Sequence, residues 1–535
     1  MTGADGLTGR VHAPTHDVPV HDVRPSVLRN MAHMMSSQAV SWILGTVAQI
    51  VQPRFLGPEG LGQLRLAFSL WMIAQVFASL GTSMYLTLEM ARDRQRGAAL
   101  VGPVLLLRLG AFSVASVVMA AYAMLAGFGG QMMVVLAIAG STMLVTTIAD
   151  TFAAALVGLE RMKYPAISFV AGKAVYTVVM VTVLLAGGGV VGVAATTIVN
   201  ATLVLVLMAH FYRRFGTITW ARPAGGYGLI VRSSSGFLAA GAIIIVYLQV
   251  DTVVISILVD ERTLGWYATA DVLASSMMFV PTIMMATLFP VIGRLHAADV
   301  AATADLVRRV FSALFLAGVA VGFGLFVVAE PLSVLLFGEE FRETGPVLGI
   351  MGLTMPLLFG TLALGTVAMA TGRQRFWNTL MLAAIGMSIG LDVVLVPLMV
   401  RLADNGAIGG AMSYMVTEAF MLGVGLACLA PLTFAGASLM RIVKILGVGA
   451  VMVLTVWPMR DAFILVPVVV GAAVFVGGVL ALGVLTPEER QMSRRLLARF
   501  DRAAAATARS SHGDATNAGF VDESELIHET EEGRT

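Results

Sequence analysis

The chain has 535 residues, of which 58% are hydrophobic and only 12% are charged, and its mean hydropathy is +0.87. Soluble domains carry about 25% charged residues, so this composition excludes an ordinary soluble protein and indicates one that lies mostly inside a membrane. The net charge of +2, with cationic residues dispersed along the chain, argues against a nucleic-acid partner, and the single cysteine, Cys428, excludes an intramolecular disulfide.

The first 32 residues are polar and contain His12, His16 and His21, without the short apolar core of a cleavable signal peptide. We predict a disordered cytoplasmic leader over 1–32. A histidine-rich metal-binding tail is the alternative, and the irregular histidine spacing disfavours it.

The rest of the chain, up to residue 485, consists of about fourteen apolar segments of roughly 20 residues, the length that spans a bilayer. The segments are continuously apolar rather than alternating, which favours helices over the strands of a membrane barrel. The predicted spans are 33–53, 64–88, 99–126, 131–157, 165–186, 190–212, 233–258, 266–292, 309–329, 345–370, 376–399, 407–430, 438–458 and 462–485. We therefore predict an all-α polytopic membrane protein with about 14 transmembrane helices.

Lysine and arginine are distributed unevenly between successive connections. Those at one end of the predicted bundle contain Arg92, Arg94, Arg96, Arg161, Lys163, Arg213, Arg214, Arg222, Arg232, Arg294, Arg308, Arg309, Arg373, Arg375, Arg441 and Lys444. Those at the other end contain only Arg54, Arg65, Arg262, Arg342, Arg401 and Arg460. Because cationic residues are retained on the cytoplasmic side, this asymmetry predicts that both termini are cytoplasmic.

The segment after the last span, 486–535, changes composition. Met492, Leu496, Leu497 and Phe500 stand near helical spacing among arginines, which is typical of an amphipathic helix on an anionic membrane surface. The acidic stretch after Asp501 predicts a disordered tail.

Two stretches of sequence recur in the same order. Leu61-Gly62, Ala67 and Leu70 return 203 positions later as Leu264-Gly265, Ala270 and Leu273. Gly189, Gly192, Ala194 and Val199 return 217 positions later as Gly406, Gly409, Ala411 and Val416. We predict two six-helix lobes, an N-lobe (33–212) and a C-lobe (233–430), followed by two further helices (438–485). Lobes with an even number of crossings form a parallel pseudo-twofold repeat, the architecture of transporters that work by alternating access.

Three motifs closely resemble the polysaccharide transporter family of the multidrug/oligosaccharidyl-lipid/polysaccharide (MOP) exporter superfamily. They are Leu56-Gly57-Pro58-Glu59-Gly60-Leu61-Gly62, Gln249-Val250-Asp251-Thr252 and Leu264-Gly265-Trp266-Tyr267-Ala268-Thr269-Ala270, and the resemblance covers about residues 30–485. It implies a fourteen-helix flippase of the bacterial inner membrane that moves undecaprenyl-pyrophosphate-linked oligosaccharides for O-antigen, capsule or exopolysaccharide assembly. It also implies a polymerase and other assembly proteins as partners, and no cofactor.

Charged residues inside the N-lobe are candidates for substrate binding, because ionisable groups in hydrocarbon usually face the bundle interior or a wet cavity. We predict that Arg108 and Lys173 bind the pyrophosphate, Arg108 with a planar fork and Lys173 with a point charge. Asp150 is the expected supporting ion-pair partner. The alternative is a purely structural pair with Asp150, and a Lys173 side chain that extends toward the cytoplasm.

Acidic residues inside the C-lobe are candidates for cation coupling. Asp251, Asp392 and Glu418 could exchange a proton or coordinate Na⁺, and for Asp251 this role is implied by the resemblance. Asp251 and Asp271 also lie close enough to the outer interface to be hydrated or to cap helix ends, which is the alternative for both.

Three uncharged polar residues, Asn200, Gln249 and Asn378, could hydrogen-bond sugars in a cavity, with interhelical hydrogen bonds as the alternative. We predict no catalytic residue and no metal site. The alternative functions are a cation-coupled multidrug antiporter, a flippase for a lipid-linked peptidoglycan precursor and, less in keeping with the short outer connections, a membrane-embedded polymerase or glycosyltransferase. The absence of a GxxxxGK[ST] motif excludes ATP-driven pumping by this chain.

Overall fold

The computed structural model describes residues 24–223, 225–429, 436–460 and 462–484. The predicted tail, 486–535, lies outside these residues, and so does the predicted leader up to residue 23. Residues 24–32 already belong to the first helix, so that helix begins earlier than predicted.

The described residues form helices and contain no strand. The helices are α1 (Arg24–Ser79), α2 (Thr82–Arg92), α3 (Arg94–Leu125), α4 (Gly130–Gly158), α5 (Lys163–Leu185), α6 (Gly189–Tyr212), α7 (Gly226–Leu258), α8 (Glu261–Ser276), α9 (Phe279–Ala298), α10 (Val300–Phe337), α11 (Thr344–Ala370), α12 (Gln374–Ala403), α13 (Gly406–Cys428), α15 (Gly436–Val456) and α16 (Leu465–Ala481), with 3-10 turns η1 (Glu339–Phe341) and η2 (Trp457–Met459).

Twelve helices of the described part are long and apolar enough to cross a membrane, and α16 is apolar but shorter. The predicted all-α polytopic membrane protein is therefore confirmed. Two predicted spans are interrupted: 64–88 is shared between α1 and α2, and 266–292 between α8 and α9.

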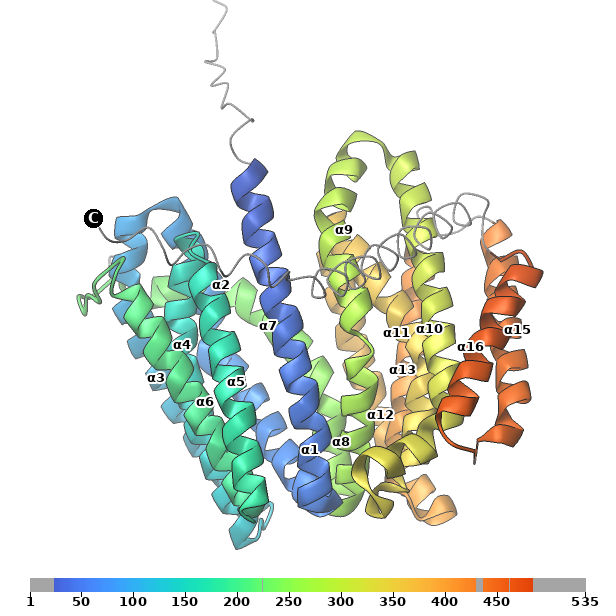
Figure 1. Cartoon of the computed structure of the whole chain (residues 1–535). Coiled ribbons are helices and arrows are strands. Elements are labelled where there is room, and N and C mark those ends of the chain that lie inside the picture. Colours follow the sequence, from blue (N-terminus) through green and yellow to red (C-terminus); the bar gives the residue numbers. More distant parts are fainter. Residues whose placement is uncertain (1–23, 224, 430–435, 461, 485–535) are drawn as a thin grey trace, which may run out of the picture.

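The α1 helix joins two predicted spans in one element. Gly57, at φ 66° and ψ 174°, interrupts it, because this backbone conformation is open to glycine and the following Pro58 has no N–H for a continuing helix. Residues 58–79 then lead back toward the end of the bundle where α2 and α3 meet (Figure 1). The motif from Leu56 to Gly62 thus forms the bend between the first two crossings.

The helices pack into two groups and an edge pair (Figure 1). We call α1–α6 the N-terminal helix group and α7–α13 the C-terminal helix group. The α10 and α11 helices pack closely because a glycine of α10 lies against the backbone of α11. A methyl group on Gly322 would lie 2.3 Å from the Gly352 carbonyl oxygen. The α15 and α16 helices pack on α10 at one edge of the molecule.

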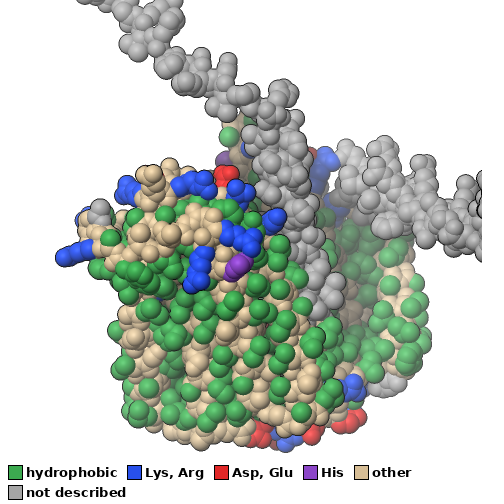
Figure 2. All heavy atoms as spheres, turned by 60° about the vertical axis from the view of Figure 1, so that its left-hand side comes forward, with side chains coloured by type: hydrophobic (Ala, Val, Ile, Leu, Met, Phe, Trp, Pro, Cys, Tyr) green, Lys and Arg blue, Asp and Glu red, His purple; other side chains and the backbone are tan. Residues whose placement is uncertain are grey.

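The surface has the charge distribution of a membrane protein. Figure 2 shows apolar side chains between two charged ends, with lysine and arginine gathered mainly at one of them. We call this the arginine-rich end and the opposite one the arginine-poor end. An apolar belt between polar ends matches a helix bundle embedded in lipid.

The two helix groups meet at the arginine-poor end, where residues 58–79 of α1 cross α8. A methyl group on Gly62 would lie 1.9 Å from the Glu261 carbonyl oxygen, and one on Gly265 would lie 1.8 Å from that of Pro58. Gly62 and Gly265 are 203 positions apart, and so are Pro58 and Glu261. The contact is therefore reciprocal, as in an isologous interface, and its two halves are the recurring sequence stretches.

Side chains reinforce this crossing. Arg65 Nη2 lies 2.5 Å from Asp271 Oδ2, and Gln63 Nε2 donates to Glu261 Oε2 at 2.5 Å. Asp271 therefore forms an ion pair between α1 and α8 rather than capping a helix end.

A second contact between the groups lies in the arginine-rich half, between the α1–α2 break and α7. Gly81 has φ 68°, and a methyl group there would lie 2.3 Å from the Leu238 backbone nitrogen. Position 81 therefore requires glycine, both for its positive φ and for the close approach of α7. The two helix groups thus touch in both halves of the bundle.

Candidate functional site

Ionisable side chains inside the bundle fall into two sets, one in each helix group. The set in the N-terminal helix group is cationic apart from Asp150. The set in the C-terminal helix group is acidic.

Arg108, on α3, is completely buried between α2, α3 and α4. Its Nε donates to the Thr82 hydroxyl at 2.7 Å, and its Nη2 donates to the Ser83 hydroxyl at 2.6 Å. Its Nη1 donates to the Thr151 hydroxyl at 2.9 Å and to the Thr147 carbonyl at 3.3 Å. These partners accept hydrogen bonds from the guanidinium N–H groups but carry no negative charge. No group in direct contact with Arg108 therefore compensates its positive charge.

Asp150 lies on α4 between two of the Arg108 partners and is half-buried. Among the ion pairs of the described residues, none joins Asp150 to Arg108 within 4.0 Å. The two groups therefore make no direct contact, although Asp150 is near enough for its charge to act on the Arg108 guanidinium.

Lys173, on α5, is half-buried. Its Nζ lies 5.3 Å from the centre of the Tyr176 ring, and its chain passes close to Gly45 of α1. Tyr176 in turn accepts a hydrogen bond from Gln52 Nε2 at 2.6 Å, so the lysine lies beside an α1–α5 polar contact. No described carboxylate forms an ion pair with Lys173.

Asp251 and Asp392 lie on neighbouring helices, α7 and α12. The Ser388 hydroxyl of α12 donates to Asp251 Oδ1. Asp392, one turn further along α12, is completely buried, and no described cation forms an ion pair with it. Its carboxylate oxygens have no hydrogen-bond partner within 3.5 Å, although the Ser413 hydroxyl lies near enough to interact with them. A buried carboxylate without a cationic partner is costly, so it favours binding of a proton or cation.

Glu418, on α13, is 1% exposed. Its Oε1 accepts a hydrogen bond from the Tyr247 hydroxyl of α7, while its Oε2 has no partner within 3.5 Å in the described part of the chain. The Thr361 hydroxyl of α11 lies near enough to interact with this carboxylate, and the Thr417 hydroxyl is buried beside it in the sequence. Four helices thus contribute oxygen atoms to the buried interior of the C-terminal helix group.

This region is rich in carboxylate and hydroxyl oxygens. The described residues contain no group of three or more His, Cys, Asp or Glu side chains that could hold a metal ion. Hard cations such as Na⁺ accept carboxylate and hydroxyl oxygens as ligands.

The three predicted uncharged polar residues lie apart from one another. Asn200, on α6, places its Oδ1 2.6 Å from where a methyl group on Gly172 would stand, so it packs at the α5–α6 crossing. Gln249, on α7, is 6% exposed, and its Oε1 has no partner among the described residues. Asn378, on α12, is half-buried near the arginine-rich end.

Sequence reasoning did not identify Thr82, Ser83, Thr151 or Tyr247 as partners of the buried charges. Spacing along α4 could have suggested Thr147 and Thr151, since they stand three residues before and one after Asp150 on a helix expected near Arg108. Nothing local in the sequence pairs Tyr247 with Glu418, because 171 positions separate them.

The comparisons with known proteins decide the family. Residues 27–296, just over half of the chain, match the family described as "Polysaccharide biosynthesis protein". The chain belongs to this family. The predicted recognition is confirmed, and a sequence comparison with curated proteins finds no match.

Solved structures of MOP-type transporters share the fold of this family member. The lipid II flippase MurJ in an inward closed conformation is 12% identical, with 83% of this chain and 97% of that chain covered and a TM-score of 0.68. An inward-facing multidrug resistance MATE family transporter of the MOP superfamily is 14% identical, with 75% and 98% covered and a TM-score of 0.61.

A third structure, a MOP superfamily transporter from Pyrococcus furiosus, is 14% identical, with 77% and 96% covered and a TM-score of 0.54. At such identities the likeness concerns the fold. This multi-pass membrane protein of the polysaccharide biosynthesis family therefore has the same fold as these transporters.

Proposed function

We propose that this protein is a flippase that moves undecaprenyl-pyrophosphate-linked oligosaccharides from the cytoplasmic to the outer leaflet of the bacterial inner membrane. The observation that carries the proposal is the separation of buried charge. Arg108 and Lys173 form no ion pair with a described carboxylate, whereas the opposite helix group holds the buried carboxylates of Asp392 and Glu418, which form no ion pair with a described cation.

A pyrophosphate carries more negative charge than one cation offsets, which supports a site with two. Arg108 would supply a fixed positive field, because its hydrogen bonds are already made, and Lys173 would make the movable contact. A cationic drug would be repelled from this site, which weighs against the multidrug antiporter.

The acidic set would couple transport to H⁺ or Na⁺. Asp251, Asp392 and Glu418 would take up the ion in one conformation and release it in the other, which links the two conformations to the ion gradient. The cationic residues of the arginine-rich end support a cytoplasmic position for that end and for both termini.

A flippase for a lipid-linked peptidoglycan precursor is the second candidate, supported by the fold shared with MurJ at a TM-score of 0.68. Both substrates present a polyprenyl pyrophosphate, so the charge of the site suits either. The sugar chain, which would lie among residues such as Asn200 and Gln249, distinguishes them.

Transport in proteoliposomes tests the proposal. The purified protein is incorporated with a fluorescent undecaprenyl-pyrophosphate oligosaccharide, and the fraction accessible to a membrane-impermeant quencher is followed over time. We expect faster equilibration than in protein-free vesicles and no movement of a cationic dye. Transport of the dye alone would refute a flippase, and transport of the peptidoglycan precursor alone would select the second candidate.

A further inference from the structure

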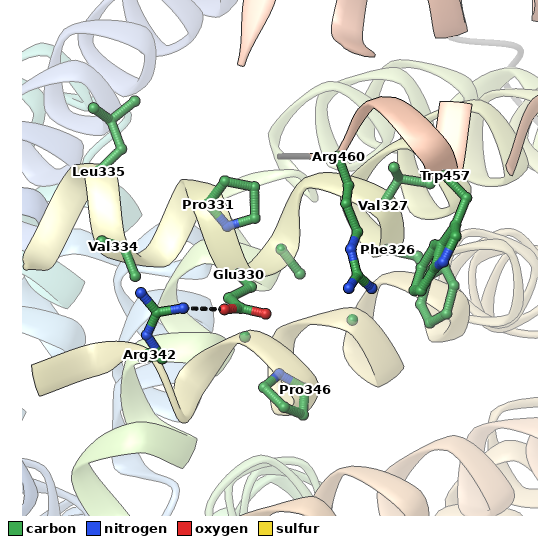
Figure 3. Close-up of a pocket in the computed structure, with 13 residues that line it drawn as sticks. Phe326, Val327, Glu330, Pro331, Val334, Leu335, Arg342, Pro346, Trp457 and Arg460 are labelled. Atoms are coloured by element: carbon green, nitrogen blue, oxygen red, sulfur yellow. Dashed lines mark hydrogen bonds and ion pairs between the residues drawn. The ribbon is translucent and has the colours of Figure 1, made fainter. Parts of the chain in front are cut away.

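A pocket at the arginine-poor end lies between α10, α11 and η2, outside both sets of buried charge. Its volume is about 570 Å³, and Figure 3 shows Glu330 and the guanidinium of Arg460 on opposite sides of its opening. Arg342 lies beyond Glu330, and Trp457 stands beside Arg460. The pocket is therefore polar at its rim, with an acid and a cation facing each other.

Arg342, one of the two arginines that line the pocket, is held by two glutamates. Arg342 pairs with Glu330, and its Nη2 lies 2.9 Å from Glu339 Oε2. The hydrogen bond to Glu339 and the negative charge of Glu339 raise the pKa of Arg342 above its ordinary value, and the hydrogen bond and charge of Glu330 add to this effect. The pocket lining holds two arginines and one glutamate, and Arg342 is already paired with Glu330 and with Glu339 outside the lining. Arg460 and Glu330 then present a cation and an acid to the pocket, which matches a ligand with both an anionic and a cationic group better than a simple anion.

The aromatic wall of the pocket places it at the membrane surface. The Arg460 guanidinium lies 4.8 Å from the centre of the Trp457 ring, and Trp457 stacks on Phe326 with 5.6 Å between ring centres. Tryptophan and arginine at helix ends are typical of the headgroup level of a bilayer.

An apolar pocket of about 510 Å³ lies next to this one, between α10 and the pair α15 and α16. Both pockets are lined by Val327, so they adjoin. The second is lined by residues such as Met452 and Phe475, and a methyl group on Gly324 would meet nothing within 4 Å. A ligand that fills both pockets needs a charged head and a hydrocarbon chain.

We propose that these adjoining pockets bind one aminophospholipid of the leaflet at the arginine-poor end. Its phosphate lies at Arg460, its primary ammonium at the free side of Glu330, and an acyl chain enters the apolar pocket. A carboxylate that already accepts from Arg342 can still accept from an ammonium, because its two oxygens offer about four lone-pair sites. The bound lipid would join the edge helices α15 and α16 to α10.

The chemistry predicts a ranking of lipids. Phosphatidylethanolamine has both the phosphate and an ammonium with N–H donors. Phosphatidylcholine has no donor on its quaternary ammonium, and phosphatidylglycerol has a net negative charge and no cation for Glu330. Retention should therefore be strongest for phosphatidylethanolamine.

The test is the amount of each lipid that stays bound to the full-length protein in native mass spectrometry, after exchange into micelles with equal amounts of the three lipids. We expect Glu330→Gln and Arg460→Gln each to lower the retained phosphatidylethanolamine at least fivefold. Gly324→Leu, which fills the apolar pocket, should lower it similarly without touching the rim. Arg262→Gln is the matched control, because Arg262 also lies over a tryptophan, 5.5 Å from the Trp266 ring centre, but lines neither pocket.

Several outcomes would overturn the proposal. Equal retention of the three lipids would remove the headgroup assignment, and preference for phosphatidylglycerol would make the site anion-binding. Displacement by glycerophosphoethanolamine, which has the headgroup without acyl chains, would make the ligand a soluble phosphoester. Because Glu330→Gln also breaks the Arg342 pair, unchanged retention in Arg460→Gln, with normal gel filtration, would be decisive against it.

Discussion

Arg108 shows how a membrane interior can hold a charge whose direct contacts are all with uncharged groups. Three hydroxyls and one carbonyl surround its guanidinium, two of the hydroxyls at the start of α2. The break at Leu80 and Gly81 brings Thr82 and Ser83 to that place, so the interruption of the second crossing and the position of the charge are one structural feature.

The neighbouring cation gives the first prediction. Lys173→Ala should lower oligosaccharide transport at least tenfold, because a charge-assisted contact to phosphate contributes roughly 1.5–3 kcal/mol. The matched control is Lys163→Ala on the same helix, whose ammonium also lies beside a tyrosine, 5.5 Å from the Tyr164 ring centre, but is exposed at the arginine-rich end. Equal transport by the two variants in proteoliposomes would remove Lys173 from the site.

The acidic set gives the second prediction. Asp392→Asn removes a buried negative charge that forms no ion pair with a described cation, and asparagine can still accept from the nearby Ser413 hydroxyl, so thermal stability should not fall. Transport should, however, stop responding to imposed pH or Na⁺ gradients. Asp404→Asn is the control on the same helix: Asp404 is exposed at the α12 end with φ 54°, a conformation that asparagine tolerates. A variant that still responds to the gradients would exclude Asp392 from coupling.

Helices were predictable to the extent that hydrophobicity defines them. A run such as 131–157 is continuously apolar, and α4 covers Gly130–Gly158. The break between α8 and α9 was missed, because residues 277 and 278 are methionines and hydropathy continues through them. The Asp251–Ser388 contact was also missed, since 137 positions separate its members and no periodicity relates them.

The α1–α8 crossing gives a prediction at the scale of two elements. Gly62→Ala would place a methyl group 1.9 Å from a backbone oxygen, so the helices must separate at a cost of about 1–3 kcal/mol. In a Cys428→Ser background, a cysteine at Leu61 should then react faster with an impermeant maleimide. Gly386→Ala on α12 is the control, because a methyl group there meets nothing within 4 Å. Unchanged labelling after Gly62→Ala would mean that the crossing does not control access.

The whole molecule combines an apolar belt, an arginine-rich end and two helix groups that carry opposite buried charge. Composition and the recurring stretches were enough to predict the polytopic bundle. They could not give the distances between helices, which depend on single glycines: Gly62 and Gly265 set the separation at one end, and Gly81 sets it in the other half.

Alternating access requires one of these two contacts to open while the other stays closed, which gives the last prediction. With Cys428 replaced by serine, cysteines at Gln63 and Glu261, whose side chains meet at 2.5 Å, are bridged by a short bis-methanethiosulfonate. Transport should stop and return when a reductant cleaves the bridge. Cysteines at Thr142 and Thr197, whose hydroxyls lie 2.8 Å apart within the N-terminal helix group, provide the control, since this pair moves as one body. If both bridged variants transport at the unbridged rate, the helix groups do not separate at α1 and α8. If both stop, the bridging reaction itself inactivates the protein, and the result no longer supports a motion of the two helix groups as rigid bodies.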